Sequence, residues 1–322
     1  MAKVFEEEQL CVKVVVEAPE SVFEEGKLNV KVLEAPESSS PPKPLLISTP
    51  TEAGEYPVLV FFHGFCLTNS CYSAIFQHVA SHGYIAVAPQ LYSLCDGLIC
   101  NLTSANNEIK AASAVLNWLS QGLQSSLPNN VQANILKLAI AGHSRGGRAA
   151  FSIALGNGQT SLKFSLLMGI DPVAGTSEGH QLDPPILTYV PRSFDVGGIP
   201  VLVVGTGLGE QKKCPLFPAC APKGLNHKEF YNECEPPRFH LVATEYGHMD
   251  MLDDKIPIGL DSLARCACKN AKKIEPMRRF VGGIMVAFLK AYSDGDSSYL
   301  NAILADPSIA PVELNPVEYD KE

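Results

Sequence analysis

The sequence has no uninterrupted apolar run of the length that a transmembrane helix needs, about 18 residues or more. Its longest candidates, such as 280–289, have the length of a core helix. Residues 1–10 also lack the basic and then apolar pattern of a secretory signal, because Glu6, Glu7 and Glu8 stand there, and they lack the arginine-rich bias of an organelle transit peptide. We therefore expect no membrane span and no cleavable targeting signal.

Positive charge is also scarce. Lys and Arg total 25 against 34 for Asp and Glu, for a formal net charge of −9 at pH 7. Contact with nucleic-acid phosphates needs clustered Lys and Arg, so the sequence argues against a nucleic-acid partner. With 322 residues, of which 46% are hydrophobic, the chain is long enough to bury one large core. We predict a single domain over 1–322, and the sequence leaves the oligomeric state open.

CxxC pairs are absent, although the chain has 10 cysteines. Without such pairs a structural zinc site is not expected. Without a secretion signal, reduced thiols are the default, because the cytosol keeps cysteines reduced. One or two disulfides are the alternative, and the candidates lie in the C-terminal half: Cys214, Cys220, Cys234, Cys266 and Cys268.

The pattern of apolar residues changes along the chain. Segments 10–18 and 28–35 alternate apolar and polar residues, as antiparallel edge strands do, and a short strand is predicted at 44–50. Uninterrupted apolar runs, typical of parallel strands buried on both faces, follow at 57–62, 84–88, 138–141, 166–170, 201–204 and 241–244. Helical segments are predicted at 72–82, 106–119, 148–155 and 277–292. This order predicts an α/β fold of the α/β-hydrolase type, with a mostly parallel central sheet, antiparallel N-terminal strands and helices on both faces.

The most informative motif is Gly142-His143-Ser144-Arg145-Gly146, which follows an apolar strand and precedes a helix-prone run. In such a nucleophile elbow, Gly142 and Gly146 leave room for a sharp turn around a strained serine whose hydroxyl is exposed. The amides at the start of the helix favour the negative charge that forms when a serine oxygen attacks a carbonyl. Glycine and serine at this spacing also occur in ordinary turns, but the flanking strand and helix favour Ser144 as a nucleophile.

Two more apolar runs end next to polar side chains. Asp171 directly follows 166–170, and His248 lies just past 241–244. Because function in parallel sheets sits at the carboxyl ends of the strands, we expect these side chains to meet Ser144. The order serine, aspartate, histidine is that of α/β-hydrolase triads. His248 would then take the proton of Ser144, and Asp171 would orient the imidazole and stabilise its charged form.

Each assignment has alternatives. Asp171 precedes a proline and would also suit a turn. His248 is favoured over the other histidines because it follows Gly247 in a loop after a strand. Asp250 is disfavoured as the acid, since so short a separation from His248 makes the far ring nitrogen hard to reach. The competing histidines are His63, His143, His180, His227 and His240, and the competing acids are Asp195, Asp250 and Asp253.

The tripeptide His63-Gly64-Phe65 follows the strand predicted at 57–62. A second oxyanion donor is expected there, so the backbone N–H groups of Phe65 and Arg145 would point at the developing oxyanion. Arg145 would act through its amide and not through its side chain. The alternative is a simple turn with His63 packed in the core.

Taken together, segments 58–65, 142–147, 169–173 and 245–250 resemble those of plant chlorophyllases, and the similarity extends over nearly the whole chain. The resemblance implies an α/β-hydrolase fold, a Ser-His-Asp triad and no metal, so no cofactor is expected. It implies that chlorophyll and water give chlorophyllide and phytol in chlorophyll breakdown, with Ser144, Asp171 and His248 matched residue by residue. The expected location is the cytoplasm, or peripheral on an endomembrane or chloroplast membrane.

A porphyrin ester with a long isoprenoid alcohol is bulky and apolar, so the site should be wide and lined by aliphatic and aromatic groups. Loops 90–102 and 205–238 are candidates for a lid or a substrate wall, because they are long and rich in apolar residues. If exposed, these residues would also dock the enzyme on the membrane that holds its substrate; otherwise they pack on the body of the protein. They are Leu91, Tyr92, Leu94, Leu98 and Ile99, and Leu208, Leu216, Phe217, Leu225, Phe230 and Tyr231.

Two other functions remain open from the sequence. A lipase or carboxylesterase for another bulky apolar ester would use the same three residues, because a triad does not distinguish between acid and alcohol partners. A non-catalytic binder with a hydrolase fold is disfavoured by the intact Ser144, Asp171 and His248. Hydrolysis of a p-nitrophenyl ester compared with chlorophyll separates these functions.

Overall fold

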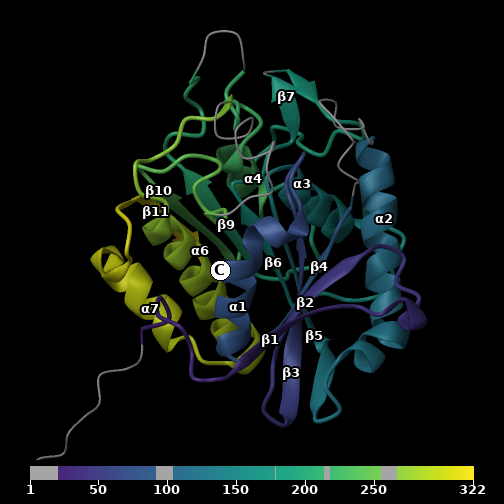
Figure 1. The fold of residues 1–322 in the computed structure, drawn as a ribbon. Coiled ribbons are helices and arrows are strands. Elements are labelled where there is room, and N and C mark those ends of the chain that lie inside the picture. The colour runs from purple at the N-terminus through teal and green to yellow at the C-terminus, as the bar shows by residue number, and fades with distance from the viewer. Residues whose placement is uncertain (1–20, 92–103, 178, 214–217, 255–266) are drawn as a thin grey trace, which may run out of the picture.

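A computed structural model of the chain describes residues 21–91, 104–177, 179–213, 218–254 and 267–322. Within these ranges one large sheet runs through the middle of the molecule (Figure 1), with its strands in the order β1-β2-β4-β3-β5-β6-β9-β10-β11. The bounds are β1 (Val30–Glu34), β2 (Leu45–Pro50), β3 (Gly54–Phe62), β4 (Ile85–Pro89), β5 (Val131–His143), β6 (Leu166–Ile170), β9 (Val201–Thr206), β10 (Arg238–Ala243) and β11 (Leu314–Asp320). Strands β7 (Gly175–Ser177) and β8 (His180–Gln181) form a separate small hairpin. The strand expected at 10–18 lies outside the described residues.

The sheet is mostly parallel, as predicted. Parallel pairing joins β4, β3, β5, β6, β9 and β10, whereas β1 and β2 at the N-terminal edge are antiparallel. At the opposite edge, β11 pairs antiparallel with β10 and was not predicted. Its Pro316 lies where the register shifts between Leu314 and Val317. An edge strand tolerates a proline at such a bulge, because no ladder hydrogen bond is needed from that residue.

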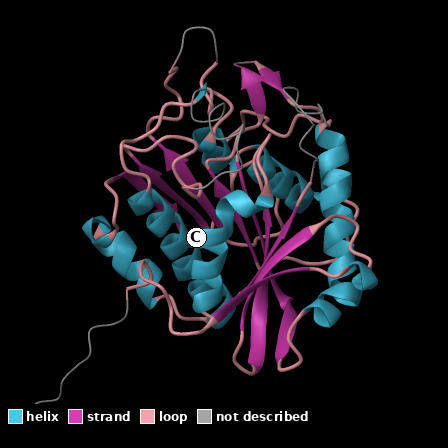
Figure 2. Cartoon of the chain, in the orientation of Figure 1, coloured by secondary structure: helices cyan, strands magenta, loops and turns pink. Residues whose placement is uncertain are grey.

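Helices cover both faces of the sheet (Figures 1 and 2), which confirms that prediction. One face packs against α1 (Ser73–Ser81), α6 (Glu275–Leu289) and α7 (Ser298–Ala305), and the other against α2 (Ala105–Trp118), α3 (Arg145–Ser152) and α4 (His227–Glu233). Helices α4 and α7 were not predicted. Short π or 3₁₀ segments lie at Glu37–Ser39, Asn69–Tyr72, Leu119–Leu123, Gln124–Ser126, Ile153–Asn157, Lys290–Asp294 and Pro307–Ile309.

Strand β3 shows why its apolar run is uninterrupted. Leu59 and Phe61 are buried in the core on the α1 and α6 side, while Val58, Val60 and Phe62 are buried in the core on the α2 and α3 side. Successive side chains on a strand point to opposite faces, so a strand covered on both faces needs apolar residues at every position. The sheet lies between the two cores. They fix the position of the rim at which its parallel strands have their carboxyl ends.

The segment 63–65 and Ser144 reach that rim from two adjacent strands. Strand β3 pairs with β5 up to Phe62 and Gly142, so the tripeptide His63-Gly64-Phe65 and Ser144 leave the sheet side by side. No helix within the described ranges is both long and apolar enough to cross a bilayer.

Candidate active site

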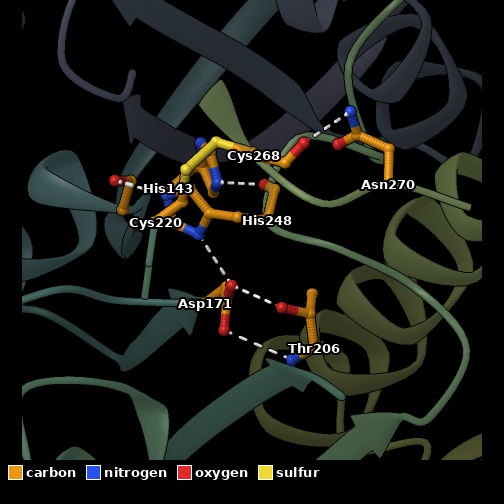
Figure 3. Close-up of a disulfide and its surroundings, with 8 residues drawn as sticks. His143, Asp171, Thr206, Cys220, His248, Cys268 and Asn270 are labelled. Carbon is orange, nitrogen blue, oxygen red and sulfur yellow. Dashed lines mark hydrogen bonds and ion pairs between the residues drawn. A yellow bond between two sulfur atoms is a disulfide. The ribbon is translucent and has the colours of Figure 1, made fainter. Parts of the chain in front are cut away.

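Ser144, Asp171 and His248 come together at the carboxyl rim of the sheet. His248 Nε2 lies 2.8 Å from Ser144 Oγ. His248 Nδ1 lies 2.7 Å from Asp171 Oδ2 (Figure 3). All three side chains are buried. Because an ionised carboxylate only accepts hydrogen bonds, Nδ1 carries the proton and Nε2 is left to accept from the serine hydroxyl. This arrangement can move a proton from Ser144 to His248.

The backbone at Ser144 is strained between β5 and α3. Its φ is 56° and its ψ is −125°, in a region that non-glycine residues rarely adopt. A Cβ on Gly142 would lie 2.4 Å from the carbonyl carbon of Gly146, and a Cβ on Gly146 would lie 2.2 Å from the carbonyl oxygen of Phe62. Both positions therefore require glycine, because any side chain would collide with backbone. The helix α3 starts at Arg145, three residues earlier than the hydrophobic pattern predicted.

Asp171 is held by both of its carboxylate oxygens. Oδ2 accepts hydrogen bonds from His248 and from the Thr206 hydroxyl, the latter at 2.7 Å, and Oδ1 accepts from the Thr206 amide at 3.2 Å (Figure 3). Burial by itself would raise the pKa of Asp171, but the hydrogen bond and the charge of His248 outweigh it, so the pKa lies below its ordinary value. Sequence reasoning missed Thr206, although it stands at the end of β9, where polar residues were to be expected.

The loop that carries His248 is fastened by Asp250, which the sequence offered as a rival acid. Asp250 Oδ2 accepts the Gly247 amide at 2.6 Å and the Ala271 amide at 2.7 Å. Gly247 has no room for a side chain, since a Cβ there would lie 1.7 Å from the carbonyl oxygen of Lys269. The other rivals have other contacts: Asp195 is exposed and caps Gly197, and Asp253 accepts the amide of Ala74.

Phe65 and Arg145 flank Ser144 at the cavity described below. A Cβ on Gly64 would lie 3.2 Å from Ser144 Cβ, so the segment after β3 packs directly against the elbow. The orientation of the two backbone N–H groups toward an oxyanion stays a prediction. His63 Nδ1 lies 2.9 Å from the Gly64 carbonyl oxygen, and its Nε2 accepts the Leu91 amide at 2.9 Å.

The side chain of Arg145 has a structural role that the sequence did not predict. Its guanidinium forms two short contacts with Glu108 on α2, at 2.7 and 2.8 Å, and lies over the Phe65 ring at 4.9 Å from the centroid. Burial raises the pKa of Glu108 to about 7, and the charge of Arg145 opposes that rise. Arg145 thus fixes the Phe65 side chain beside Ser144.

Ser144 and His248 line a cavity of about 380 Å³. Its other walls are largely apolar and are formed by Phe65, Arg145, Val173, Gly175, Thr176, Leu182, Pro218, Ala219, Cys220, Pro222, Met249 and Ala267. A mostly apolar cavity with a few polar groups is typical of a site for a small organic molecule. Within the described ranges no group of three or more His, Cys, Asp or Glu side chains is arranged to hold a metal ion.

The loop 205–238 contributes to this cavity only in part. Its segment 218–222 forms one wall, lined by Pro218, Ala219, Cys220 and Pro222. Leu225 and Phe230 are instead buried in the core on the α4 side, where the Phe230 ring packs 4.9 Å from that of Phe151. Leu216 and Phe217 lie outside the described residues, as does nearly all of the loop 90–102. Leu91 is buried.

A disulfide joins Cys220 to Cys268 (Figure 3), and Cys220 lines the same cavity as His248. The sequence favoured reduced thiols, so for this pair the less favoured alternative is present. The bond ties the wall 218–222 to the segment that follows the His248 loop, across a sequence separation of 48. Cys214 and Cys266, the other candidates nearby, lie outside the described residues.

The chain is similar to known proteins over most of its length. A sequence model described as Chlorophyllase matches residues 18–321. Chlorophyllase-2 of Arabidopsis thaliana is 48% identical over 295 residues, covering 87% of this chain and 91% of the relative. Chlorophyllase-1, chloroplastic, of Citrus unshiu is 50% identical over 289 residues, covering 88% and 83%. The cutinase est2 of Thermobifida alba is 21% identical over 258 residues, covering 80% and 67%.

Proposed function

Because the chain belongs to the chlorophyllase family, whose members are α/β-hydrolases acting on carboxylic esters, we propose that it cleaves the phytyl ester of chlorophyll with Ser144 as the nucleophile. Chlorophyll and water are converted to chlorophyllide and phytol. The observation that carries the assignment of residues is that His248 lies within hydrogen-bond distance of both Ser144 and Asp171, beside an apolar cavity.

The mechanism follows from the hydrogen bonds. Ser144 Oγ attacks the ester carbonyl carbon while His248 Nε2 takes its proton, and Asp171 stabilises the imidazolium. The carbonyl oxygen becomes an oxyanion that the N–H groups of Phe65 and Arg145 stabilise. His248 then passes the proton to the departing phytol oxygen, which leaves the chlorophyllide acid as an ester of Ser144. Water, deprotonated by His248, cleaves this acyl-enzyme and restores the serine.

The cavity supports a bulky, apolar substrate. Val173, Leu182, Met249, Pro218 and Pro222 all line it, and none of these side chains carries a charge. Such a lining favours an aliphatic or aromatic group by removing its surface from water. We therefore propose that the wall 218–222 contacts the substrate.

We also propose that the mouth of the cavity rests on the chlorophyll-bearing membrane, so that the protein is peripheral to it. Pro218 is exposed at the cavity and would face the lipid surface. Co-sedimentation with phosphatidylcholine vesicles that contain chlorophyll tests this: Pro218→Asp should weaken binding. The control is Leu136→Asp, because Leu136 is 90% exposed but lies in β5, well before the strand reaches the rim. Equal binding by both variants would contradict the proposal.

The test of the reaction compares chlorophyll in detergent with a p-nitrophenyl ester. The wild type should release chlorophyllide and phytol, and Ser144→Ala should lose about 10⁴-fold or more in kcat on both substrates while still binding chlorophyll. Turnover of the p-nitrophenyl ester without turnover of chlorophyll would indicate an esterase for another substrate. Turnover of neither substrate by the wild type would indicate a binding protein.

A further inference from the structure

Three hydrogen bonds form a chain beneath the candidate active site. The Gly64 amide nitrogen lies 3.0 Å from the Tyr72 hydroxyl oxygen, that oxygen lies 2.7 Å from His143 Nδ1, and His143 Nε2 lies 2.9 Å from the His248 carbonyl oxygen. Figure 3 shows the last of these contacts. The chain therefore connects the segment after β3 with the loop after β10, and it passes through the residue that precedes Ser144.

The two ends of the chain determine its direction. An amide N–H can only donate and a carbonyl oxygen can only accept, so the Tyr72 oxygen accepts from Gly64, and His143 carries its proton on Nε2. Burial and the neighbouring His248 hold the pKa of His143 well below its ordinary value, so the ring is neutral and Nδ1 is an acceptor. The Tyr72 hydroxyl must then donate to Nδ1. Every bond thus runs the same way, from Gly64 to His248.

The chain of hydrogen bonds from Gly64 to His248 is closed off from water. Tyr72 and His143 are both 0% exposed, and Tyr72 packs against the rings of Phe61 and Phe76 at 5.0 and 6.0 Å. A buried polar group that loses its partner cannot turn to solvent instead, so each bond constrains the groups that it joins. Neither residue lines the cavity, so the chain acts on the site from behind and without contact with a substrate.

The spacing around the chain is tight. The rings of His143 and His248 lie 4.6 Å apart, and those of Tyr72 and His143 lie 5.7 Å apart. A Cβ on Gly64 would come within 3.0 Å of His143 Nδ1. The segment before Phe65, the elbow and the His248 backbone therefore pack on the same ring.

We propose that Tyr72 and His143 are positioning residues that hold the oxyanion donor Phe65 and the base His248 in register around Ser144. This inference rests on the function proposed above. Tyr72 fixes the Gly64 amide, which belongs to the peptide directly before the one that carries the Phe65 N–H, while His143 fixes the His248 backbone. Since misplacing a reacting group by about 1 Å costs about a hundredfold in rate, small adjustments here have large effects.

The main test is Tyr72→Phe, which removes one oxygen atom and keeps the ring. The matched control is Tyr84→Phe, because Tyr84 is equally buried but donates its hydroxyl to Asp294 at the other rim, before β4 begins. On a p-nitrophenyl ester, Tyr72→Phe should lower kcat by about tenfold to a hundredfold with KM changed by less than about twofold, below the cost of deleting a whole oxyanion donor. Tyr84→Phe should keep kcat within about twofold of the wild type.

A second readout separates positioning from general loosening of the fold. A trifluoromethyl ketone forms a hemiketal with a reactive serine and places its oxyanion where the transition state does. Its affinity should fall in Tyr72→Phe by about the same factor as kcat/KM, and it should be unchanged in Tyr84→Phe. Unchanged ketone affinity together with reduced kcat would overturn the link to Phe65.

Two substitutions at His143 test its two hydrogen bonds separately. His143→Asn keeps an acceptor near Nδ1 for Tyr72, and His143→Gln keeps a donor near Nε2 for the His248 carbonyl. Each should retain part of the activity that His143→Ala loses. In ¹⁵N-histidine spectra of the wild type, His143 should appear as the neutral Nε2–H tautomer across the active pH range, and an Nδ1–H tautomer would contradict the direction of the chain.

Ser144→Ala, measured in parallel, distinguishes the two levels of failure. Full activity in Ser144→Ala would overturn the proposed function itself. An inactive Ser144→Ala together with equal kcat in Tyr72→Phe and Tyr84→Phe would overturn only the positioning role of Tyr72.

Discussion

The two sides of the cavity are held in place by different means. On the reaction side, formed by Ser144, Asp171, His248 and the segment 63–65, the side chains that face one another are buried and joined by hydrogen bonds to groups on neighbouring strands. On the apolar wall, 218–222, the side chains that face the cavity are uncharged. The wall is anchored by the bond from Cys220 to Cys268 and by the Ala221 amide, which donates to Gly209 at 3.0 Å.

The difference separates reaction from recognition. Hydrogen bonds impose direction and distance, so the reaction side has one working geometry that is the same for every ester. Apolar contact is non-directional, so the wall needs only to exclude water and to match the shape of the substrate. Substitutions on the reaction side should therefore lower kcat for all esters, and substitutions in the wall should change which esters are used.

The largest effect should come from Asp171→Asn. An amide at this position donates toward His248 Nδ1 and favours the tautomer with the proton on Nε2, which cannot accept the Ser144 proton. By analogy with serine proteases, kcat should fall by about 10⁴-fold, equally for chlorophyll and for a p-nitrophenyl ester. Steady-state kinetics on both substrates checks this.

The control for that change is Asp250→Asn. Asp250 accepts the backbone amides of Gly247 and Ala271, and the carbonyl oxygen of an asparagine can still accept them, so kcat should fall by less than about tenfold. A larger loss in Asp250→Asn than in Asp171→Asn would reassign the acid.

An intermediate effect should follow from the double variant Cys220→Ser/Cys268→Ser. Without the disulfide, the wall 218–222 loses an anchor, and ordering it when substrate binds costs free energy. This should raise KM for chlorophyll about threefold to tenfold. The kcat for a small p-nitrophenyl ester should stay within about twofold, because the reaction side is untouched. A fall in kcat for both esters would show that the two sides are coupled.

The smallest effect concerns pH. Burial lowers the pKa of His63 to about 4, so between that value and its unfolded pKa of about 6.5 the unfolded chain binds a proton that the folded chain does not. The free energy of unfolding should therefore fall as the pH falls through this window, with a contribution from His63 of up to about 1.4 kcal/mol per pH unit. Above pH 6.5 this contribution to the pH dependence should vanish.

Urea unfolding of His63→Asn at several pH values measures this. The substitution should remove that part of the slope, whereas His180→Asn, at an exposed position, should leave it in place. Identical slopes in His63→Asn and in the wild type would show that the imidazole is not buried as neutral. The wall 218–222 carries no histidine, so we expect it to contribute less than His63 to the pH dependence of the free energy of unfolding.

The sequence predicted some residues of the site and missed others. Ser144, Asp171 and His248 were predicted because each stands at the end of an apolar strand, and parallel strands end at one rim. Thr206 also stands at the end of a strand, but nothing local indicated that it hydrogen-bonds Asp171. Tyr72 was missed because it begins the helix predicted at 72–82, and no pattern there marks a hydrogen bond to His143.

Local patterns also failed where a segment has two environments. For the apolar residues of 205–238 the sequence left open a lid or wall and packing on the body of the protein, and both occur. Leu225 and Phe230 belong to the core, and Phe230 lies on the short helix α4. Strand β11 was missed because Asn315 and Pro316 interrupt its alternation, and a strand paired on one side only tolerates this. Whether the chain is a single domain stays a prediction.

The shared ladder between β3 and β5 has a consequence for how the enzyme accommodates a broad ring system. Its hydrogen bonds reach Phe62 and Gly142, directly beneath the nucleophile and the segment 63–65, and no spacer separates the two. The nucleophile and the segment 63–65 cannot move apart without breaking hydrogen bonds between β3 and β5 at the centre of the sheet. We therefore expect any widening at the entrance among the cavity-lining residues that follow β6, β9 and β10.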